Sequence, residues 1–316
     1  MDTALHRLRE RFQGPGLEIE RLGGDGPLAL QVRAERGQGT VLLRGAQLWS
    51  WRPAGHHDLL WQSPVAGPST AACPYGGIPI CWPYMGAGPQ AGDPFHGPAR
   101  THDWQLLTAQ DDGDGGWIIR LGTDHRAAGW RQSFSMTLTL RLGAAIDAGL
   151  EIVNSGDTEL VSAGALHSYL AVGDRQHLRL HGLRGRDYSP QPDAETKRDD
   201  GDPLPEDDEW VRNYRFDNDH SHVLIDDPGY GRRLHLGLRG ARALVLWNPG
   251  PQRATAIAGI GPHGWPGFLC LEAANIMHDR RHLAPGQSHV LATTIAVDEE
   301  PVTNRLTHRL AWPFGP

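Results

Sequence analysis

The stretch Phe134–Leu142, FSMTLTLRL, decides the fold class because every second residue in it is apolar. An alternation of period two is typical of a β-strand with one face in a core and the other face toward water. Turn residues follow at Gly143–Asp147, and the next strand is expected at Ala148–Val153. The stretch therefore begins a series of strands that are joined by short turns.

The rest of the chain continues this series. Asn154–Asp157 is another turn signal, and a strand is expected after it at Leu160–Ala165. Further short strands, with turn residues at intervals of about eight to twelve positions, are expected at Leu28–Val32, Thr40–Leu43, Leu48–Trp51, Trp117–Leu121, His177–Leu180, Val223–Ile225, Leu234–Leu238, Ala243–Trp247, Gly267–Glu272 and Val290–Ala296. Many short strands predict an all-β protein, a sandwich or barrel of antiparallel sheets.

Few segments depart from this pattern. Short amphipathic helices are expected only at Met1–Phe12 and Thr303–Leu310. Asp187–Glu209 is rich in acidic residues, Pro and Gly, and we expect a long surface loop there. Because no change of composition marks a second domain, we predict a single domain over residues 1–316.

Composition narrows the partners and the location. The formal charge is -7 and the 30 Lys and Arg residues form no basic block, which argues against a nucleic-acid partner. No run of roughly 18 apolar residues could span a membrane, and Met1–Arg11 lacks the apolar run of a signal peptide. The three cysteines, Cys73, Cys81 and Cys270, argue for a reducing compartment and against a disulfide framework or a zinc site. We therefore expect a cytoplasmic protein.

Two ionisable residues stand at the ends of apolar strands. His167 directly follows the strand that ends at Leu166, where an imidazole could be held rigid as a general acid or base, or simply bonded to a backbone carbonyl. Glu272 ends the apolar run Phe268–Leu271, where a carboxylate is costly unless it is paired or exchanges protons. Burial would raise the pKa of Glu272, as a general base near neutral pH requires; the alternative is a structural carboxylate.

A loop and several aromatic residues complete the candidate site. The segment His96–Arg100, HGPAR, has a donor at each end, and Arg100 suits a carboxylate, a phosphate or sugar hydroxyls, or else ties the loop to backbone carbonyls. Trp82, Trp104 and Trp247 are neighbours of the polar segments in sequence. Their rings could pack against the apolar face of a pyranose, or fill the core.

Taken together and in order, these segments resemble the aldose 1-epimerase superfamily. The matching segments are GGIPICWP at 76–83, HGPAR at 96–100, DW at 103–104, LHSY at 166–169, VGD at 172–174, WNPG at 247–250 and CLEAAN at 270–275. The closest branch is the hexose-6-phosphate mutarotases, also called glucose-6-phosphate 1-epimerases, and the similarity covers residues 25–297, the expected core of the domain. The resemblance implies a galactose-mutarotase-like β-supersandwich and the interconversion of α and β anomers.

The resemblance also implies roles for three residues. Glu272 would take the proton from the anomeric hydroxyl, His167 would give a proton to the ring oxygen, and His96 would hydrogen bond near the reacting oxygens. The ring opens, the aldehyde rotates about C1–C2, and the ring closes on the other face with the roles reversed. No metal and no organic cofactor is implied, since one carboxylate and one imidazole, each worth roughly 10²–10⁴-fold, suffice.

The phosphate end of the site departs from that branch. Where the branch usually has an Arg before the GGIP segment and a Gln before the HGPAR segment, this chain has Tyr75 and Phe95, and only Arg100 is retained. Losing an Arg removes a bidentate, charge-assisted contact to a phosphate. Tyr75 and Phe95 could instead stack on the sugar ring or on an aglycone.

One further departure concerns sugar hydroxyls. An Asp of the branch aligns with Asn213, which keeps one acceptor and adds two donors. Asp217 and Asp219 lie close in sequence and could replace that Asp.

The sequence thus predicts an isomerase, a mutarotase for a hexose 6-phosphate, in which His167 and Glu272 are catalytic. Substrate-binding roles are expected for His96, Arg100, Tyr75, Phe95, Asn213, Trp82 and Trp247. Alternatives are a mutarotase for an unphosphorylated or otherwise modified aldose, and a non-catalytic carbohydrate-binding protein on the same fold. The only expected partner is a small sugar or sugar phosphate, and we expect a monomer or weak dimer.

Two other enzyme classes fit less well. The 17 histidines suggest a metal-dependent enzyme of the cupin type, but no His-x-His pair is followed at the right distance by Glu and His. A glycosidase would need two carboxyl groups facing one bond, and only Glu272 stands out.

Overall fold

The computed structural model describes residues 2–68, 73–128, 130–191, 194–201 and 209–298, which are built mainly of antiparallel strands. The α-helices in these ranges are α1 (Thr3–Phe12) and α2 (Gly250–Ala256). Single 3-10 turns, η1 to η4, occur at Pro98–Arg100, Arg175–His177, Trp265–Gly267 and Met277–Asp279. Within this part of the chain, no helix has the length and apolar character needed to cross a membrane.

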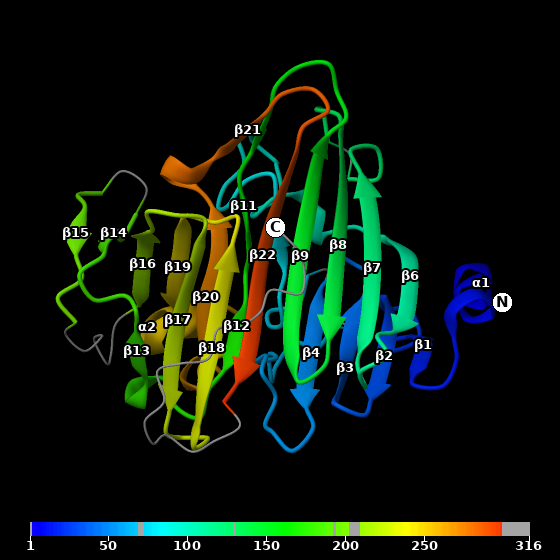
Figure 1. Cartoon of the computed structure of the whole chain (residues 1–316), viewed down its shortest axis with the longest axis horizontal. Coiled ribbons are helices and arrows are strands. Elements are labelled where there is room, and N and C mark those ends of the chain that lie inside the picture. Colours follow the sequence, from blue (N-terminus) through cyan, green and yellow to red (C-terminus); the bar gives the residue numbers. More distant parts are fainter. Residues whose placement is uncertain (1, 69–72, 129, 192–193, 202–208, 299–316) are drawn as a thin grey trace.

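One sheet of eight strands, called here the β8 sheet, runs across the whole molecule (Figure 1). Its strands in spatial order are β13 (Arg179–His181), β17 (His220–Asp227), β18 (Arg232–Arg239), β22 (Ser288–Val297), β9 (Ala145–Asn154), β8 (Phe134–Leu142), β7 (Trp117–Asp124) and β6 (Gln105–Asp111). The alternating stretch of the sequence is β8 itself, and its apolar residues are the buried ones. The period of two therefore decides which face of this sheet enters the core.

A second sheet of eight strands, called here the β20 sheet, lies at the left of Figure 1. Its strands in spatial order are β15 (Lys197–Arg198), β14 (Asp187–Ser189), β16 (Trp210–Arg215), β19 (Ala243–Asn248), β20 (Phe268–Asn275), β11 (Gly164–Leu166) and β5 (Ile80–Cys81), and β12 (Tyr169–Ala171) also pairs with β20. All eight residues of β20 are buried, so this strand is covered on both faces. Such double burial explains why its sequence, FLCLEAAN, lacks a clean alternation.

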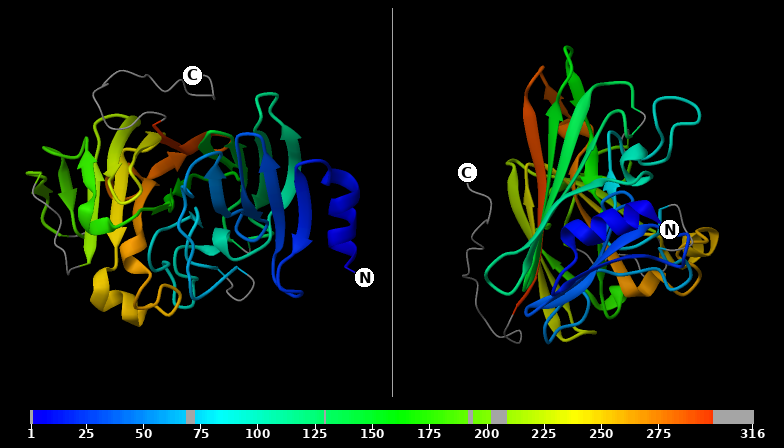
Figure 2. Two further views of the ribbon diagram at one scale, coloured as in Figure 1. Left: turned by 90° about the horizontal axis from the view of Figure 1, so that it is seen from below. Right: turned by 90° about the vertical axis from the view of Figure 1, so that its right-hand side faces the viewer.

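The remaining strands form two smaller sheets. β1 (Leu17–Arg21), β2 (Leu28–Ala34), β3 (Gly37–Leu42) and β4 (Leu48–Pro53) form a four-stranded meander, with α1 beside β1 at its outer edge (Figure 2). The two-stranded sheet consists of β10 (Leu160–Ser162) and β21 (Arg281–Leu283).

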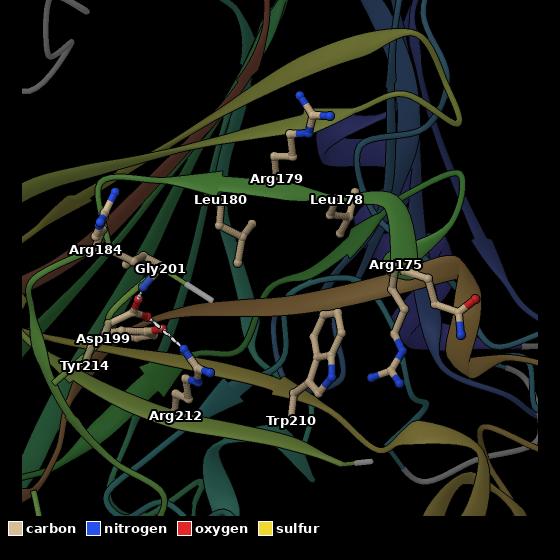
Figure 3. Close-up of a pocket in the computed structure, with 12 residues that line it drawn as sticks. Arg175, Leu178, Arg179, Leu180, Arg184, Asp199, Gly201, Trp210, Arg212 and Tyr214 are labelled. Carbon is tan, nitrogen blue, oxygen red and sulfur yellow. Dashed lines mark hydrogen bonds and ion pairs between the residues drawn. The ribbon is translucent and has the colours of Figure 1, made fainter. Parts of the chain in front are cut away.

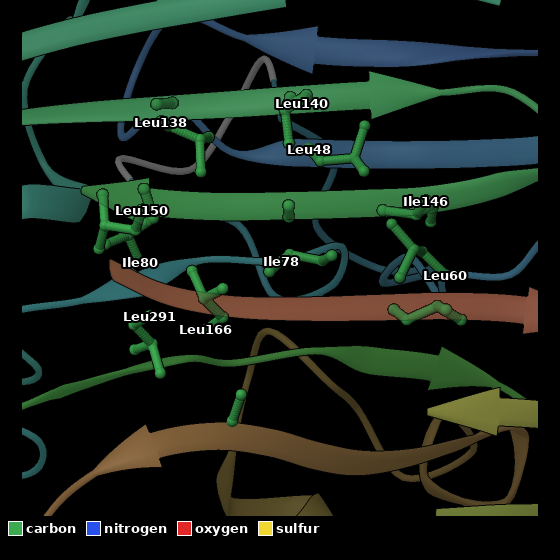
Figure 4. Close-up of a cluster of buried hydrophobic side chains, with 14 of the residues drawn as sticks. Leu48, Leu60, Ile78, Ile80, Leu138, Leu140, Ile146, Leu150, Leu166 and Leu291 are labelled. Atoms are coloured by element: carbon green, nitrogen blue, oxygen red, sulfur yellow. The ribbon is translucent and has the colours of Figure 1, made fainter. Parts of the chain in front are cut away.

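The main hydrophobic core lies between the β8 sheet on one side and the β20 and β1–β4 sheets on the other. Leu138 and Leu150 from the β8 sheet belong to the same buried cluster as Leu166 of β11 and Leu48 of β4 (Figure 4). Each fully buried side chain of this size contributes about 1.5–3 kcal/mol. The other face of the β20 sheet is covered differently, by loops and α2, through two smaller buried clusters.

The predicted antiparallel β-sandwich is confirmed, with local corrections. The expected turn Gly143–Asp147 is shorter, because Ala145 already pairs with Ala296 and begins β9. The expected loop Asp187–Glu209 contains β14 and β15, which pair through Tyr188 and Lys197. The helix expected at Thr303–Leu310 lies outside the described residues.

Candidate active site

Glu272 lies in the middle of β20, on the face away from the main core. Leu269, Leu271 and Ala273 belong to the main core, so the alternating residues Cys270 and Glu272 face the loop-covered side. The Glu272 side chain is 0% exposed. Neither of its carboxyl oxygens has a hydrogen-bond partner among the described residues. A buried carboxyl group without a partner is costly, and such groups concentrate at functional sites.

His167 lies directly across from Glu272. β11 and β12 pair with β20 in one continuous register, through Leu166↔Ala273 and Tyr169↔Cys270. The same register places residue 167 opposite residue 272, and directly opposed side chains of neighbouring strands are in contact range. The His167 Nε2 is 3.5 Å from the Glu272 Oε1. One imidazole and one carboxyl group thus meet, although they are 105 positions apart in the sequence.

The surroundings of this pair favour its uncharged form. Burial raises the pKa of Glu272 well above its ordinary value of 4.5. Burial lowers the pKa of His167 well below 6.5, and nearby His96 and Arg100 lower it further. Both pKa shifts have the same physical cause: a site shielded from water disfavours the charged form of each side chain. Both shifts favour the form of the pair in which Glu272 is protonated and His167 is neutral.

Aromatic rings surround His167. Tyr169 stacks on the imidazole with ring centroids 4.7 Å apart and planes inclined by 7°. Trp247 meets it edge-on at 6.2 Å, and Trp247 Nε1 donates to Glu209 Oε1. Tyr169 did not stand out in the sequence, but the period of two already places positions 167 and 169 on one face of a strand. These contacts hold the imidazole ring in one orientation.

His96 is fixed as a hydrogen-bond donor. The backbone N–H of Gly86 donates to His96 Nδ1 at 2.9 Å, so the ring proton must lie on Nε2. Burial, with the charge of Arg100, lowers the pKa of His96 to about 3, so the ring stays neutral. Its ring centroid is 5.7 Å from that of His167. The position is held by a left-handed backbone at His96 (φ 66°) and by Gly97, where a Cβ would lie 2.0 Å from the carbonyl oxygen of Trp82.

The residues at the expected phosphate end have distinct environments. Arg100 is partly buried and its Nε donates to Cys73 Sγ at 2.7 Å. Phe95 is 65% exposed, with its ring 4.1 Å from that of His96. Tyr75 is partly buried, and its ring lies so close to Gly259 that a Cβ there would be 2.2 Å away. This end of the site thus combines one guanidinium with two aromatic rings.

Asn213 lies in the same transverse row of the β20 sheet as the catalytic candidates. The row follows from the pairings Asn213↔Val245 and Val245↔Glu272, which place residues 213 and 272 two strands apart on one face, about 10 Å. Asn213 Nδ2 donates to the backbone carbonyl of Ser189, and its side-chain oxygen has no bond to a described residue. Asp219, in contrast, is bound by Arg242 and Arg281.

Trp82 does not fit the expected contact with a sugar. Its side chain is 1% exposed, lies in the main core and packs edge-on against Phe134 at 4.3 Å. Its Nε1 donates to Ser162 Oγ at 2.8 Å. Cys81 faces the loop-covered side, and the alternation sends Trp82 to the opposite face.

A separate cavity of about 230 Å³ lies on the other face of β16 (Figure 3). Trp210, Arg212 and Tyr214 line it, and these alternate with Asn213 along the strand. Two of its polar groups, Arg212 and the Tyr214 hydroxyl, donate to Asp199. This cavity is not continuous with the face that carries Glu272.

Known proteins resemble this chain in sequence and in fold. A family model for aldose 1-epimerase matches residues 29–296. A provisionally named glucose-6-phosphate 1-epimerase of Escherichia coli K12 is 31% identical over 259 residues, which cover 81% of this chain and 85% of that protein. A protein of Cenchrus ciliaris with the same provisional name is 26% identical and covers 79% of this chain and 82% of its own length.

The structural comparison agrees. The crystal structure of a provisionally named mutarotase from Salmonella typhimurium has a TM-score of 0.81 and 27% sequence identity, and the match covers 92% of this chain and 96% of that one. The family model spans both β11 and β20, the strands that bring His167 and Glu272 together. The chain therefore belongs to the aldose 1-epimerase family.

Proposed function

We propose that this protein interconverts the α and β anomers of a hexose 6-phosphate, with Glu272 and His167 as its acid–base pair. The observation that carries the proposal is the buried carboxyl–imidazole contact of 3.5 Å on two neighbouring strands, in which neither carboxyl oxygen has a hydrogen-bond partner among the described residues. Simple binding of a sugar needs no such pair. Ring opening does, because one proton must leave the anomeric hydroxyl and another must reach the ring oxygen.

The reaction conserves protons at each step. A basic group takes the proton of the anomeric hydroxyl, the C1–O5 bond breaks as the C1=O1 double bond forms, and an acidic group protonates O5. The open aldehyde rotates about C1–C2, and O5 then attacks the other face of C1 while both protons return. With the proton of the pair on His167, Glu272 is the base and His167 is the acid.

The pair can start from its uncharged form. In the proposed cycle the mobile proton starts on Glu272, the form that burial favours, and it crosses to His167 when substrate hydroxyls donate to the carboxylate. The two forms have the same net charge, so the exchange between them requires no proton from solvent. Alternatively His167 takes the hydroxyl proton while Glu272 protonates O5, which is the same reaction with reversed polarity.

Neighbouring groups orient the sugar. His96 Nε2–H is the fixed donor, suited to a sugar oxygen that becomes negative during transfer. Trp247 offers a partly exposed ring beside His167, suited to the apolar face of a pyranose. Because His96 and Trp247 are the partly exposed neighbours of a covered pair, we place the entry of the sugar on their side.

Arg100 supplies the charge for the phosphate group. It is the cation that acts on both His96 and His167, and a guanidinium is a strong partner for a phosphate dianion. Its Nε donates to Cys73 Sγ and its side chain also hydrogen bonds the thiol of Cys81, so two cysteines hold the guanidinium in place.

The direct test is anomer-exchange NMR on glucose 6-phosphate with wild-type protein, Glu272→Gln and His167→Ala. Each substitution should lower the exchange rate by about 10²–10⁴-fold. Circular dichroism of both variants controls for folding. Binding of glucose 6-phosphate without any protein-dependent exchange would instead identify a non-catalytic carbohydrate-binding protein.

A second candidate is a mutarotase for an aldose that carries no phosphate. Tyr75 and the exposed Phe95 favour it, because they place aromatic rings where the resemblance implies an Arg and a Gln. The same NMR measurement on glucose decides between the two, through the ratio of kcat/KM for the two sugars. Replacing Phe95 by Gln should raise kcat/KM for glucose 6-phosphate only if the phosphate binds beside it.

A further inference from the structure

The catalytic candidates have a third neighbour, the thiol of Cys270. Cys270 and Glu272 are two positions apart on β20, so their side chains leave the strand on the same face. One ligand atom from each of His167, Cys270 and Glu272 lies within 4.8 Å of the other two. All three residues are buried.

The distance between the imidazole and the carboxyl group fits a coordination tetrahedron. With Zn–N and Zn–O bonds near 2.0–2.2 Å, two tetrahedral ligand atoms are roughly 3.4 Å apart. His167 Nε2 and Glu272 Oε1 are 3.5 Å apart, which is too long for a good hydrogen bond but suits a shared cation. Both oxygens of the fully buried Glu272 also lack hydrogen-bond partners among the described residues.

The chemistry of the three donors selects the ion. A thiolate, an imidazole and a carboxylate together suit Zn²⁺, whereas Mg²⁺ and Ca²⁺ prefer oxygen ligands alone. A divalent cation bound by one thiolate and one carboxylate leaves the site with no net charge, which lowers the cost of placing charges in the interior. Binding releases the thiol proton of Cys270 and the proton that Glu272 and His167 share.

We propose that His167, Cys270 and Glu272 form a binding site for Zn²⁺, and that zinc bound there inhibits the epimerase. The binding rests on the three donors alone. The inhibition rests on the proposed function, because zinc occupies the lone pairs of Glu272 and His167 that transfer protons to and from the sugar. Cys270 takes no part in that transfer, so its replacement removes a zinc ligand and leaves the proton-transfer groups in place.

The test separates metal binding from catalysis. Co²⁺, a spectroscopic substitute for zinc, is added to chelator-treated wild-type protein and to the variants Cys270→Ala and Cys81→Ala. We expect one Co²⁺ per chain and a thiolate-to-cobalt absorption band in the wild type and in Cys81→Ala, which keeps the three donors. The band should be absent in Cys270→Ala. Absence of the band in the wild type, or its persistence in Cys270→Ala, would overturn the site.

The inhibition is measured on the same three proteins by anomer-exchange NMR with added Zn²⁺. Zinc should lower the wild-type rate more than tenfold and a chelator should restore it. The half-inhibiting zinc concentration should rise at least tenfold in Cys270→Ala, whose rate without zinc equals that of the wild type. Equal inhibition of both proteins would refute the role of Cys270. A wild type that forms the cobalt band but shows no exchange with chelator would refute the proposed epimerase activity and leave the metal site standing.

Discussion

Replacing Glu272 by Val should stabilise the protein, although substitutions in a fully buried strand such as β20 usually destabilise it. Most substitutions destabilise by about 1 kcal/mol, so the expected sign is unusual. The carboxyl group is 0% exposed, and neither oxygen has a hydrogen-bond partner among the described residues. An unsatisfied buried polar group costs about 1–3 kcal/mol, and Val, which is similar in size and suited to strands, removes that cost. We expect a gain of about 1–3 kcal/mol in the free energy of unfolding at pH 8.

The pH dependence gives a second check. Because burial raises the folded-state pKa of Glu272 above 4.5, the folded protein binds more protons than the unfolded chain at pH values above 4.5. The stability of the wild type therefore falls as pH rises from 4.5 toward the folded-state pKa. Glu272→Val lacks this group, so its advantage should be smallest below pH 4.5 and should grow as the pH rises.

The assay is urea unfolding followed by tryptophan fluorescence at several pH values, with anomer exchange measured in parallel. Glu272→Gln is the matched control: it keeps polar atoms in the same place, so it should lose activity without the gain in stability. A folded Glu272→Val that is less stable than the wild type by more than about 1 kcal/mol at pH 8 would refute the reasoning. It would mean that the carboxylate has a structural partner.

Three further predictions concern other charged groups. Asp227→Ala leaves the buried Arg232 without its ion-pair partner, which lies 3.3 Å away. Urea unfolding should show a free energy of unfolding lower by about 3–5 kcal/mol. The control Asp114→Ala removes an exposed partner of Arg36 and should change that free energy by less than about 1 kcal/mol. Burial lowers the folded-state pKa of His289 from 6.5 to about 4. Between these pH values the unfolded chain binds more protons than the folded protein, so stability falls as the pH drops. His289→Gln keeps a donor to Asn275 and should raise the free energy of unfolding at pH 4 by about 3 kcal/mol in the same assay. Arg100→Met should raise KM for glucose 6-phosphate about 10–100-fold and leave KM for glucose nearly unchanged; an equal rise for both sugars would show that Arg100 does not bind the phosphate.

The sequence predicts strands well where one face of the strand is buried and the other is not. Phe134–Leu142 alternates cleanly and coincides with β8. β20 was expected to end at Glu272 but continues to Asn275, because Ala273 and Ala274 are buried on opposite faces and give no alternation. The short helix α2 was missed because Gly250 and Pro251 at its start are typical turn residues.

The site was predictable only in part. His167 and Glu272 each stand out locally, but their contact depends on the pairing of β11 and β12 with β20, which no local pattern reveals. The resemblance to a family supplied that contact. Trp82 shows the converse case. The sequence places an aromatic residue next to the site, but the structure shows that its side chain points into the core.

The double burial of β20 has a consequence for how this family can evolve. Leu269, Leu271 and Ala273 pack into the main core from one side of a single strand, while Glu272 faces the reactive site on the other. Selection can therefore vary the reactive face, and with it the choice of sugar, without dismantling the architecture that supports it. A directed-evolution library confined to the neighbours of Glu272 on that face, such as Val245 and Asn213, is the natural place to begin changing specificity.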